Sequence, residues 1–279
     1  MPQQLHVTKA DGTQEEFQIK KLKNSLQRAG ATEQDVAEIL MQMDSHMYDG
    51  ITTNVLYRQA FDLLRNTEKT TAARYSLRRA MISLGPTGFP FEDYLAKLFA
   101  SQGYTTKTRV MLKGKCVTHE VDVVAYKDDH SFVAEAKFHA QPGIKSDLQV
   151  VLYSHARFMD IAGTKLHTRD KGGMTTGKVI TNTKFTSTAI QYAKCAGLEL
   201  LSWDYPRKNN LQDMIEAAKL YPITVLQSLS VREKRALLET GKVLCTDIID
   251  NQNLLRSIGV PQKKMGAIME EGARLCTIS

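Results

Sequence analysis

Hydrophobic and charged residues alternate along two neighbouring runs, 119–126 and 131–138, and this alternation predicts two adjacent strands. Asp128-Asp129 between them is typical of a tight turn, so we expect an antiparallel hairpin. In the register that this turn sets, Asp122 faces Glu135 and Glu120 faces Lys137. The apolar positions would share the opposite face and cover the core: Val121, Val123, Ala125, Phe132, Ala134, Ala136 and Phe138.

Strand and helix patterns alternate around this hairpin. An amphipathic helix from Phe91 is closed by Gly103, and a strand pattern over 104–112 follows. After the hairpin come a helical stretch over 146–161, the strand GKVIT, a helix over 187–196 and the strand LELLSW. This order predicts an α/β sheet with helices on both faces.

The flanking segments are mostly helical. Asp11-Gly12 lies between short alternating runs, which indicates a hairpin with a primed turn. Helical patterns follow over 20–30, over 33–47 with Thr32 as N-cap, and over 54–84, the last broken near Asn66. The segment PTGFPFEDY, 86–94, has the prolines and glycine of an interdomain linker, and beyond Pro206 the chain is helical. We therefore expect domains over 1–85, 86–210 and 211–279.

Composition limits the class of protein. The chain has 279 residues, of which 42% are hydrophobic and 24% charged, as in an ordinary globular protein. Its four cysteines are scattered without a CxxC pair, so neither a zinc knuckle nor a disulfide framework is expected. The N-terminus has no apolar signal region, and no run of about 18 apolar residues occurs, so we expect a cytoplasmic protein without a membrane partner.

The basic charge is concentrated in the middle of the chain. The net charge is +7, and residues 86–215 contain 17 basic and 13 acidic residues. This placement favours a polyanion such as DNA as a partner, although a solvated, mildly basic surface explains it about equally well.

The charged face of the hairpin is a candidate metal site. Directly opposed carboxylates repel one another, and a divalent cation between them removes this cost. Mg²⁺ takes oxygen ligands from one or two carboxylates and keeps several waters, which fits Asp122 and Glu135. The alternative from spacing alone is an amphipathic hairpin whose polar face is solvated.

These residues resemble a known signature. Asp122, followed by Glu135-Ala136-Lys137 on the next strand, resembles the PD-(D/E)xK nucleases. The preceding helix with Phe91-Glu92 and the following Gly103-Tyr104 resemble the Mrr-like restriction endonucleases, and QVVLY matches the QxxxY helix motif of related nucleases. The chain departs from the signature at Val121, where many members have proline.

The resemblance covers about residues 88–206 and implies a role for each matching residue. Asp122 and Glu135 would bind Mg²⁺ or Mn²⁺, with the Ala136 carbonyl as a third ligand. Lys137 would serve the attacking water. The other candidates would position the scissile phosphate or the waters of the metal, or add a ligand from the first helix: Gln149, Tyr153 and Glu92.

Residues 5–85 resemble an ATP-cone, the nucleotide-sensing domain of many ribonucleotide reductases. The match runs through VTKADG, IKKL, YDGITT and AARYSLRRA. It implies that ATP or dATP binds as a regulatory ligand, and we expect contacts from Val7, Lys9, Lys21 and Thr53. A lysine beside a turn and another at a helix start can bind phosphates by charge together with helix N-terminal amides. Ala10 stands where ATP-cones often have arginine, and the alternative is a helical interaction domain with solvated lysines.

The sequence therefore predicts a metal-dependent DNA endonuclease, a hydrolase of restriction type, that responds to adenine nucleotides and forms a homo-oligomer. One alternative is a non-catalytic nucleotide-sensing DNA-binding or scaffold protein with a nuclease-like fold. Another makes the ATP-cone a regulator of a partner enzyme. The tail is predicted to be helical, with two helices joined by a tight turn at Gly259. Its segment IGVPQKK loosely resembles a helix-hairpin-helix unit, while plain helical packing or dimerisation explains the tail at least as well.

Overall fold

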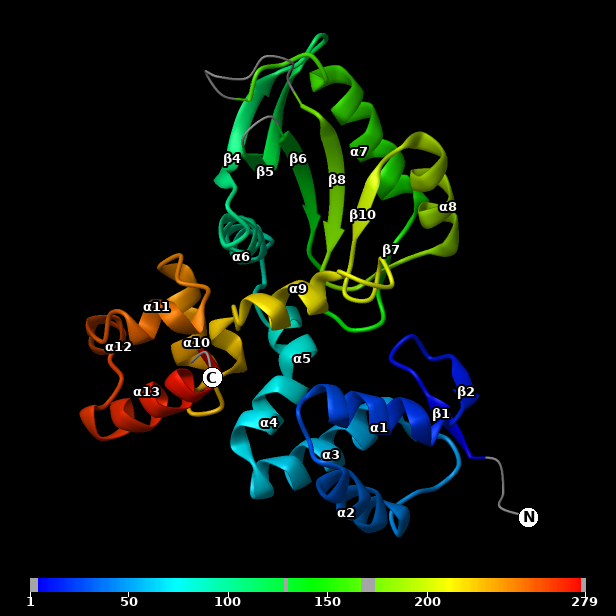
Figure 1. Ribbon diagram of the computed structural model, residues 1–279, viewed down its shortest axis with the longest axis vertical. Coiled ribbons are helices and arrows are strands. Elements are labelled where there is room, and N and C mark those ends of the chain that lie inside the picture. The colour runs from blue at the N-terminus through cyan, green and yellow to red at the C-terminus, as the bar shows by residue number, and fades with distance from the viewer. Residues whose placement is uncertain (1–4, 128–129, 167–173, 277–279) are drawn as a thin grey trace.

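The computed structural model describes residues 5–127, 130–166 and 174–276. Figure 1 shows three parts: an N-terminal part of helices and short strands, a sheet flanked by helices, and a group of C-terminal helices beside them. The expected order of a mostly helical N-terminus, an α/β sheet and a helical C-terminus is confirmed. The turn predicted at Asp128-Asp129 lies outside the described residues.

The N-terminal part has the strand order β2-β1-β3, with β1 antiparallel to β2 and parallel to β3. The Thr32 side chain caps α2 in a capping box with Asp35, as the sequence predicted for this helix start. A separate apolar core that includes Leu26, Ile51 and Leu64 holds the helices together. The elements are β1 (His6–Thr8), β2 (Gln14–Glu16), α1 (Ile19–Arg28), α2 (Glu33–Asp44), β3 (Ile51–Thr52), α3 (Thr53–Thr67) and α4 (Lys69–Tyr75).

The turn of the first hairpin differs from the prediction. The Gly12 N–H donates to the Lys9 carbonyl at 3.0 Å, and Gly12 has φ 80°, while Asp11 has no positive φ. A type I′ turn needs positive φ at both central residues, so the predicted primed turn is wrong. Gly12 instead provides the left-handed position that returns the chain to β2.

The central sheet has the order β10-β8-β6-β5-β4. The strands β4, β5 and β6 are antiparallel neighbours, whereas β6, β8 and β10 run parallel, so α7 and α8 serve as crossover helices. A small parallel pair, β7 with β9, lies beside the sheet. The elements are α6 (Phe89–Ala100), β4 (Thr105–Lys113), β5 (Thr118–Lys127), β6 (His130–Lys137), β7 (Lys145–Ser146), α7 (Leu148–Ile161), β8 (Thr176–Thr181), β9 (Lys184–Phe185), α8 (Ser187–Ala196) and β10 (Glu199–Leu201).

The predicted register of the β5–β6 hairpin is confirmed from Val123 opposite Ala134 to Lys127 opposite His130. Val123 packs in the core on the α6 side, but Val121, expected on the same face, packs in the core on the α7 side. The break in alternation coincides with Arg109 on β4, which has φ 53° between the pairs Thr108–Val123 and Val110–Val121. A non-glycine residue at positive φ interrupts the pleat. The prediction for Val121 is therefore wrong.

The segment predicted as a linker is part of the packed structure. The helix predicted from Phe91 is present as α6 and begins two residues earlier, so residues 89–94 belong to a helix and the linker prediction is wrong for them. Pro90 stands in the first turn of the helix, where its missing N–H costs nothing. On the N-terminal side, α5 (Leu77–Ile82) and Leu84 are buried in the same core as Phe91 and the sheet. The join between the first two parts is therefore a continuous apolar core.

The C-terminal helices pack on that same core. Gly259, with φ 80°, turns the chain between α12 and α13, at the tight turn that the sequence predicted. The helix-hairpin-helix likeness and the three domain boundaries stay predictions. The elements are α9 (Leu211–Ala218), the 3-10 helix η1 (Ile223–Val225), α10 (Val231–Glu239), α11 (Cys245–Ile249), α12 (Asn253–Ser257) and α13 (Gln262–Cys276).

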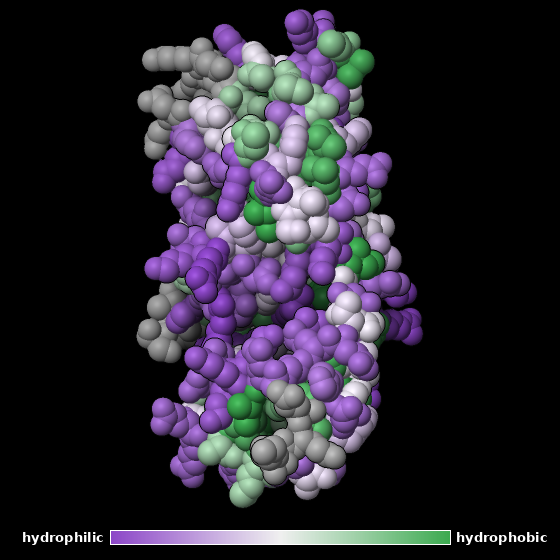
Figure 2. All heavy atoms as spheres, turned by 90° about the vertical axis from the view of Figure 1, so that its right-hand side faces the viewer, coloured by the Kyte–Doolittle hydropathy of each residue, from purple (hydrophilic) through white to green (hydrophobic). Residues whose placement is uncertain are grey.

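Polar contacts also join the N-terminal part to the others. Arg28 on α1 pairs with Asp213 and with Glu216 on α9. The Asp11 turn lies against the start of β7, where Lys145 Nζ is 3.7 Å from the Asp11 carboxylate. Figure 2 shows that hydrophilic side chains gather around a hollow between the N-terminal part and the sheet domain on the α8 and β2 side. No helix among the described residues is long and apolar enough to span a membrane.

Candidate active site

Asp122 and Glu135 come together where β5 and β6 separate. The last paired residues are Val123 and Ala134, and one residue further the Asp122 carboxylate accepts a hydrogen bond from the Ala136 N–H at 2.6 Å. This bond fixes the Asp122 carboxylate against the backbone of the Glu135-Ala136-Lys137 segment. The structure thus brings together the two carboxylates that the sequence predicted to face one another.

Both carboxylates are held in an environment that disfavours two negative charges. The pKa of Glu135 is raised to about 7, chiefly by burial and next by the Asp122 charge, while Arg157 and Lys137 partly offset these effects. Burial also raises the pKa of Asp122, against the lowering effect of the Ala136 N–H bond and Arg157. A pair of buried carboxylates of this kind is stabilised by a cation.

Glu92 on α6 lies near the pair but is held by another side chain. It is 7% exposed, and burial, together with the Asp122 charge, raises its pKa. Its carboxylate accepts a hydrogen bond from Arg109 at 3.1 Å, and Arg109 also binds Asp93 at 2.7 Å. Glu92 is therefore in range of Asp122, but Arg109 occupies its carboxylate.

Sequence reasoning did not identify Arg109. Its contribution depends on a left-handed backbone conformation inside β4, with φ 53°. Such conformations in non-glycine residues are strained and occur often at functional sites. No residue pattern signals this conformation, so only the structure reveals it.

The remaining candidates lie at the end of β6 and on α7. Lys137 is exposed on the strand end, two residues beyond Glu135. The Asp147 side chain caps α7 by accepting from the Val150 N–H at 3.2 Å. Gln149 and Tyr153, four residues apart, are both exposed, so one helical face presents the two side chains of the QxxxY motif.

Arg157 extends this face by one more turn and was missed in the sequence. One terminal nitrogen donates to Glu135 at 2.5 Å and to the Glu120 carbonyl at 3.1 Å, and the other donates to the Tyr153 hydroxyl at 3.2 Å. The repeat of four residues from Gln149 through Tyr153 is the signal that could have identified it.

The residues around the carboxylates suit a hard cation that keeps part of its water shell. Within the described ranges, no group of three or more His, Cys, Asp or Glu side chains is arranged to hold a metal. Mg²⁺ is commonly bound by one or two carboxylates together with waters and substrate phosphates. Asp122 and Glu135 supply two such carboxylates, and the guanidinium on Glu135 shows that this position accepts positive charge.

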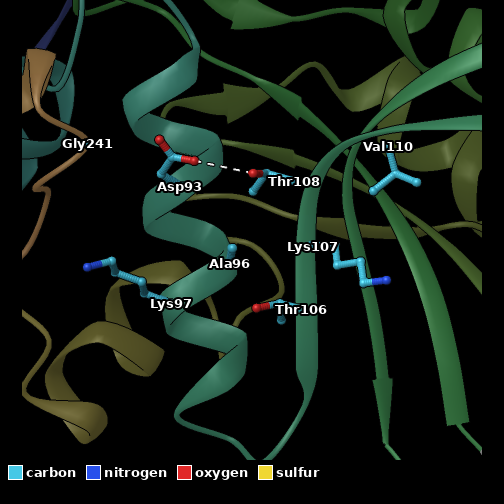
Figure 3. A pocket seen from close by; sticks show the side chains of 8 residues that line it. All are labelled: Asp93, Ala96, Lys97, Thr106, Lys107, Thr108, Val110 and Gly241. Atoms are coloured by element: carbon cyan, nitrogen blue, oxygen red, sulfur yellow. Dashed lines mark hydrogen bonds between the residues drawn. The ribbon is translucent and has the colours of Figure 1, made fainter. Parts of the chain in front are cut away.

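A cavity elsewhere in the domain does not contain the candidate residues. It has a volume of about 570 Å³ and lies between α6, β4 and Gly241, with Asp93 bonded to Thr108 on its wall (Figure 3). Lys97 on the same wall binds Asp247 of α11. The cavity wall includes neither Asp122 nor Glu135, so this cavity is separate from the candidate active site.

The predicted nucleotide residues of the N-terminal part converge at one end of its small sheet. Lys9 directly follows β1, and Thr53 directly follows β3, which runs parallel to β1 with Thr8 opposite Thr52. Lys9 and Lys21 bind the two oxygens of one carboxylate, Glu15, at 2.6 and 3.2 Å. Val7, in contrast, is 4% exposed and packs in the core, so its side chain is not accessible to a nucleotide.

Comparison with known proteins defines the class. Residues 5–81 match the ATP cone domain, residues 86–205 match a restriction endonuclease model, and residues 221–276 match the AF1548-like C-terminal domain. The protein thus combines an ATP-cone with a restriction endonuclease-like domain of Mrr type, in the predicted order.

An uncharacterised protein of Archaeoglobus fulgidus is 35% identical over 182 residues, which are 65% of this chain and 99% of the relative. The crystal structure of AF1548, a protein of unknown function, matches with a TM-score of 0.56 and 34% identity, covering 68% of this chain and 98% of that one. The chain belongs to the AF1548-like family.

Proposed function

We propose that the protein is a divalent-metal-dependent DNA endonuclease whose activity is controlled by adenine nucleotides bound to its ATP-cone. The observation that carries this proposal is the pair of partly buried carboxylates, Asp122 and Glu135, beside an exposed lysine at the end of β6. The restriction endonuclease match over the same residues supports it.

Each side chain has a physical role in this proposal. Asp122, Glu135 and the Ala136 carbonyl would hold Mg²⁺ or Mn²⁺, which supplies charge to the scissile phosphate and makes water more acidic. Lys137 places positive charge where the phosphate gains negative charge during hydrolysis. Gln149 and Tyr153 offer polar groups on the exposed face of α7 to orient the phosphate.

A non-catalytic, nucleotide-sensing DNA-binding protein is the second candidate. The observation that favours it is the Arg157–Glu135 ion pair, because a carboxylate already neutralised by arginine has less need of a metal. Calorimetric titration of Mn²⁺ into the full chain separates the two: saturable binding that is lost in Asp122→Asn supports the endonuclease, and no binding supports the second candidate.

DNA affinity is expected to fall steeply with salt, because lysine and arginine contacts to phosphates release counterions. With six or more such contacts, affinity should drop about 1,000-fold or more between roughly 50 and 200 mM salt. Fluorescence anisotropy of a labelled duplex with the full chain in EDTA measures this without cleavage. An affinity that does not change with salt would exclude a phosphate-binding surface.

Nucleotide control has a candidate route in the contact between the Asp11 turn and the nuclease domain. A Cβ at Gly143 would lie 3.0 Å from the Asp11 nitrogen, so the two segments touch. Residues 138–147 connect the end of β6 to the start of α7, and this segment therefore joins Lys137 to the QxxxY face. A nucleotide phosphate that bound Lys9 and Lys21 in place of the Glu15 carboxylate would change the ion pairs of the hairpin that carries Asp11.

Lys9→Ala and Lys21→Ala are expected to remove the effect of ATP and dATP on oligomer size and cleavage rate while sparing basal metal-dependent cleavage. Each substitution removes a charge that pairs with Glu15 and would bind phosphate. Lys23→Ala is the matched control, because Lys23 is exposed on α1, the same helix as Lys21. Light scattering and cleavage assays on the same samples decide the outcome. A nucleotide that binds tightly but changes neither mass nor rate would reduce the cone to a stabilising domain.

A further inference from the structure

Arg157 is the cation that the described structure places directly on the candidate metal ligand. Its side chain and that of Glu135 are each 15% exposed, so the ion pair is largely shielded from water. The guanidinium also contacts the Glu120 carbonyl, and electrostatic attraction links it to Asp122. In this arrangement the guanidinium supplies the positive charge that faces Glu135.

The hydrogen bonding of Arg157 is incomplete in this position. Its Nε is buried and has no hydrogen-bond partner among the described residues, although both terminal nitrogens are engaged. A buried donor without an acceptor is unfavourable, so the pairing with Glu135 leaves one hydrogen-bond donor of the side chain unsatisfied. A guanidinium has donors in a planar fork that matches the oxygens of a phosphate.

The surroundings leave open space beside the guanidinium. A groove of about 440 Å³ borders Arg157 and is lined by Tyr153, Ala156, Met159, Val117 and Lys115 among others. The Tyr153 ring lies under the guanidinium at 5.0 Å and is 63% exposed. Arg157 can therefore leave Glu135 while it stays in contact with Tyr153, on the face that also carries Gln149.

We propose that Arg157 neutralises Glu135 in the metal-free protein and, when a divalent cation binds the carboxylates, moves to a phosphate of the substrate strand. This proposal rests on the proposed function, because it takes Asp122 and Glu135 as the ligands. It assigns two successive partners to one side chain: a carboxylate before loading and a phosphodiester afterwards. Metal binding and the capture of DNA are thereby coupled.

The test is the response of metal affinity and cleavage to Arg157→Gln, with Arg157→Lys as the variant that keeps the charge. Calorimetric titration of Mn²⁺ into the full chain without DNA should show about 3- to 10-fold tighter binding for Arg157→Gln, because the competing cation is gone. Its plasmid cleavage rate at saturating Mn²⁺ should fall about 100-fold, as for loss of one donor to a transition state. Arg157→Lys should bind Mn²⁺ within about twofold of the wild type and retain intermediate cleavage.

The opposite signs of the two effects separate this role from a structural one. Melting temperatures in EDTA and in Mn²⁺ should show a lower value for Arg157→Gln in EDTA and a larger gain with Mn²⁺ than in the wild type. Weaker or unchanged Mn²⁺ binding in Arg157→Gln would overturn the proposal, and so would tighter binding with undiminished cleavage. If Arg157→Gln does not fold, Arg157→Lys decides: a large loss of Mn²⁺ affinity in it would contradict the exchange. No Mn²⁺ binding by the wild type would instead overturn the proposed function itself.

Discussion

Asp122→Asn and Glu135→Gln are each expected to reduce DNA cleavage at saturating Mg²⁺ by about 1,000-fold or more, since each removes charge worth several kcal/mol at the metal and phosphate. Asp122→Asn is the cleaner variant. It leaves the Arg157–Glu135 ion pair in place, whereas Glu135→Gln also leaves a buried guanidinium without its carboxylate. Initial rates of plasmid nicking measure the effect.

Glu120→Gln is the matched control for this prediction. Glu120 is exposed on the same strand, and only its backbone carbonyl contacts Arg157 in a hydrogen bond, so cleavage should stay within about twofold of the wild type. Circular dichroism confirms that the variants are folded. Equal cleavage rates in folded wild type and Asp122→Asn would refute the assignment of the site.

Lys137→Gln is expected to reduce the cleavage rate about 100- to 1,000-fold and to leave DNA affinity within about twofold. The charge on Lys137 acts where negative charge develops in the transition state, while one of many lysines contributes little to overall binding. Single-turnover rates at saturating protein separate the chemical step from binding. Lys107→Ala, at an exposed lysine on β4 of the same sheet, should change neither quantity strongly. A loss confined to affinity would make Lys137 a DNA-binding residue only.

The sequence predicts the elements of this protein well because local signals and tertiary packing agree. Helix caps such as Thr32 and the alternation along β6 correspond to observed helix starts and strand faces. The register of the central hairpin follows from the position of its turn, and it is correct for every pair from Val123–Ala134 to Lys127–His130. The carboxylate pair then follows from that register and from the nuclease resemblance.

The errors arise where backbone geometry or long-range packing decides. Val121 changes faces near Arg109, whose positive φ has no signature in the residue pattern. Pro90 reads equally well as a linker residue and as the first turn of a helix, and only the burial of Phe91 against α5 distinguishes the two. The Arg109–Glu92 ion pair joins β4 to α6, two elements that come together only in the folded chain.

The packed junction also changes how the ATP-cone could act. Because α5 shares a core with α6 and the C-terminal helices, a packed connection replaces the expected interdomain linker. A nucleotide signal would then pass through surfaces that already touch, such as the ion pair between Asp11 and Lys145, rather than by reorientation about a free hinge.

The most direct test of the account is cleavage of supercoiled plasmid by the purified full chain in Mg²⁺ or Mn²⁺, with EDTA and the Asp122→Asn variant as parallel reactions. We expect nicked and linear products with the wild type and a divalent cation, and intact plasmid with EDTA or with the variant. Products of equal yield in all reactions, or intact plasmid in every one from folded protein that binds DNA, would contradict it.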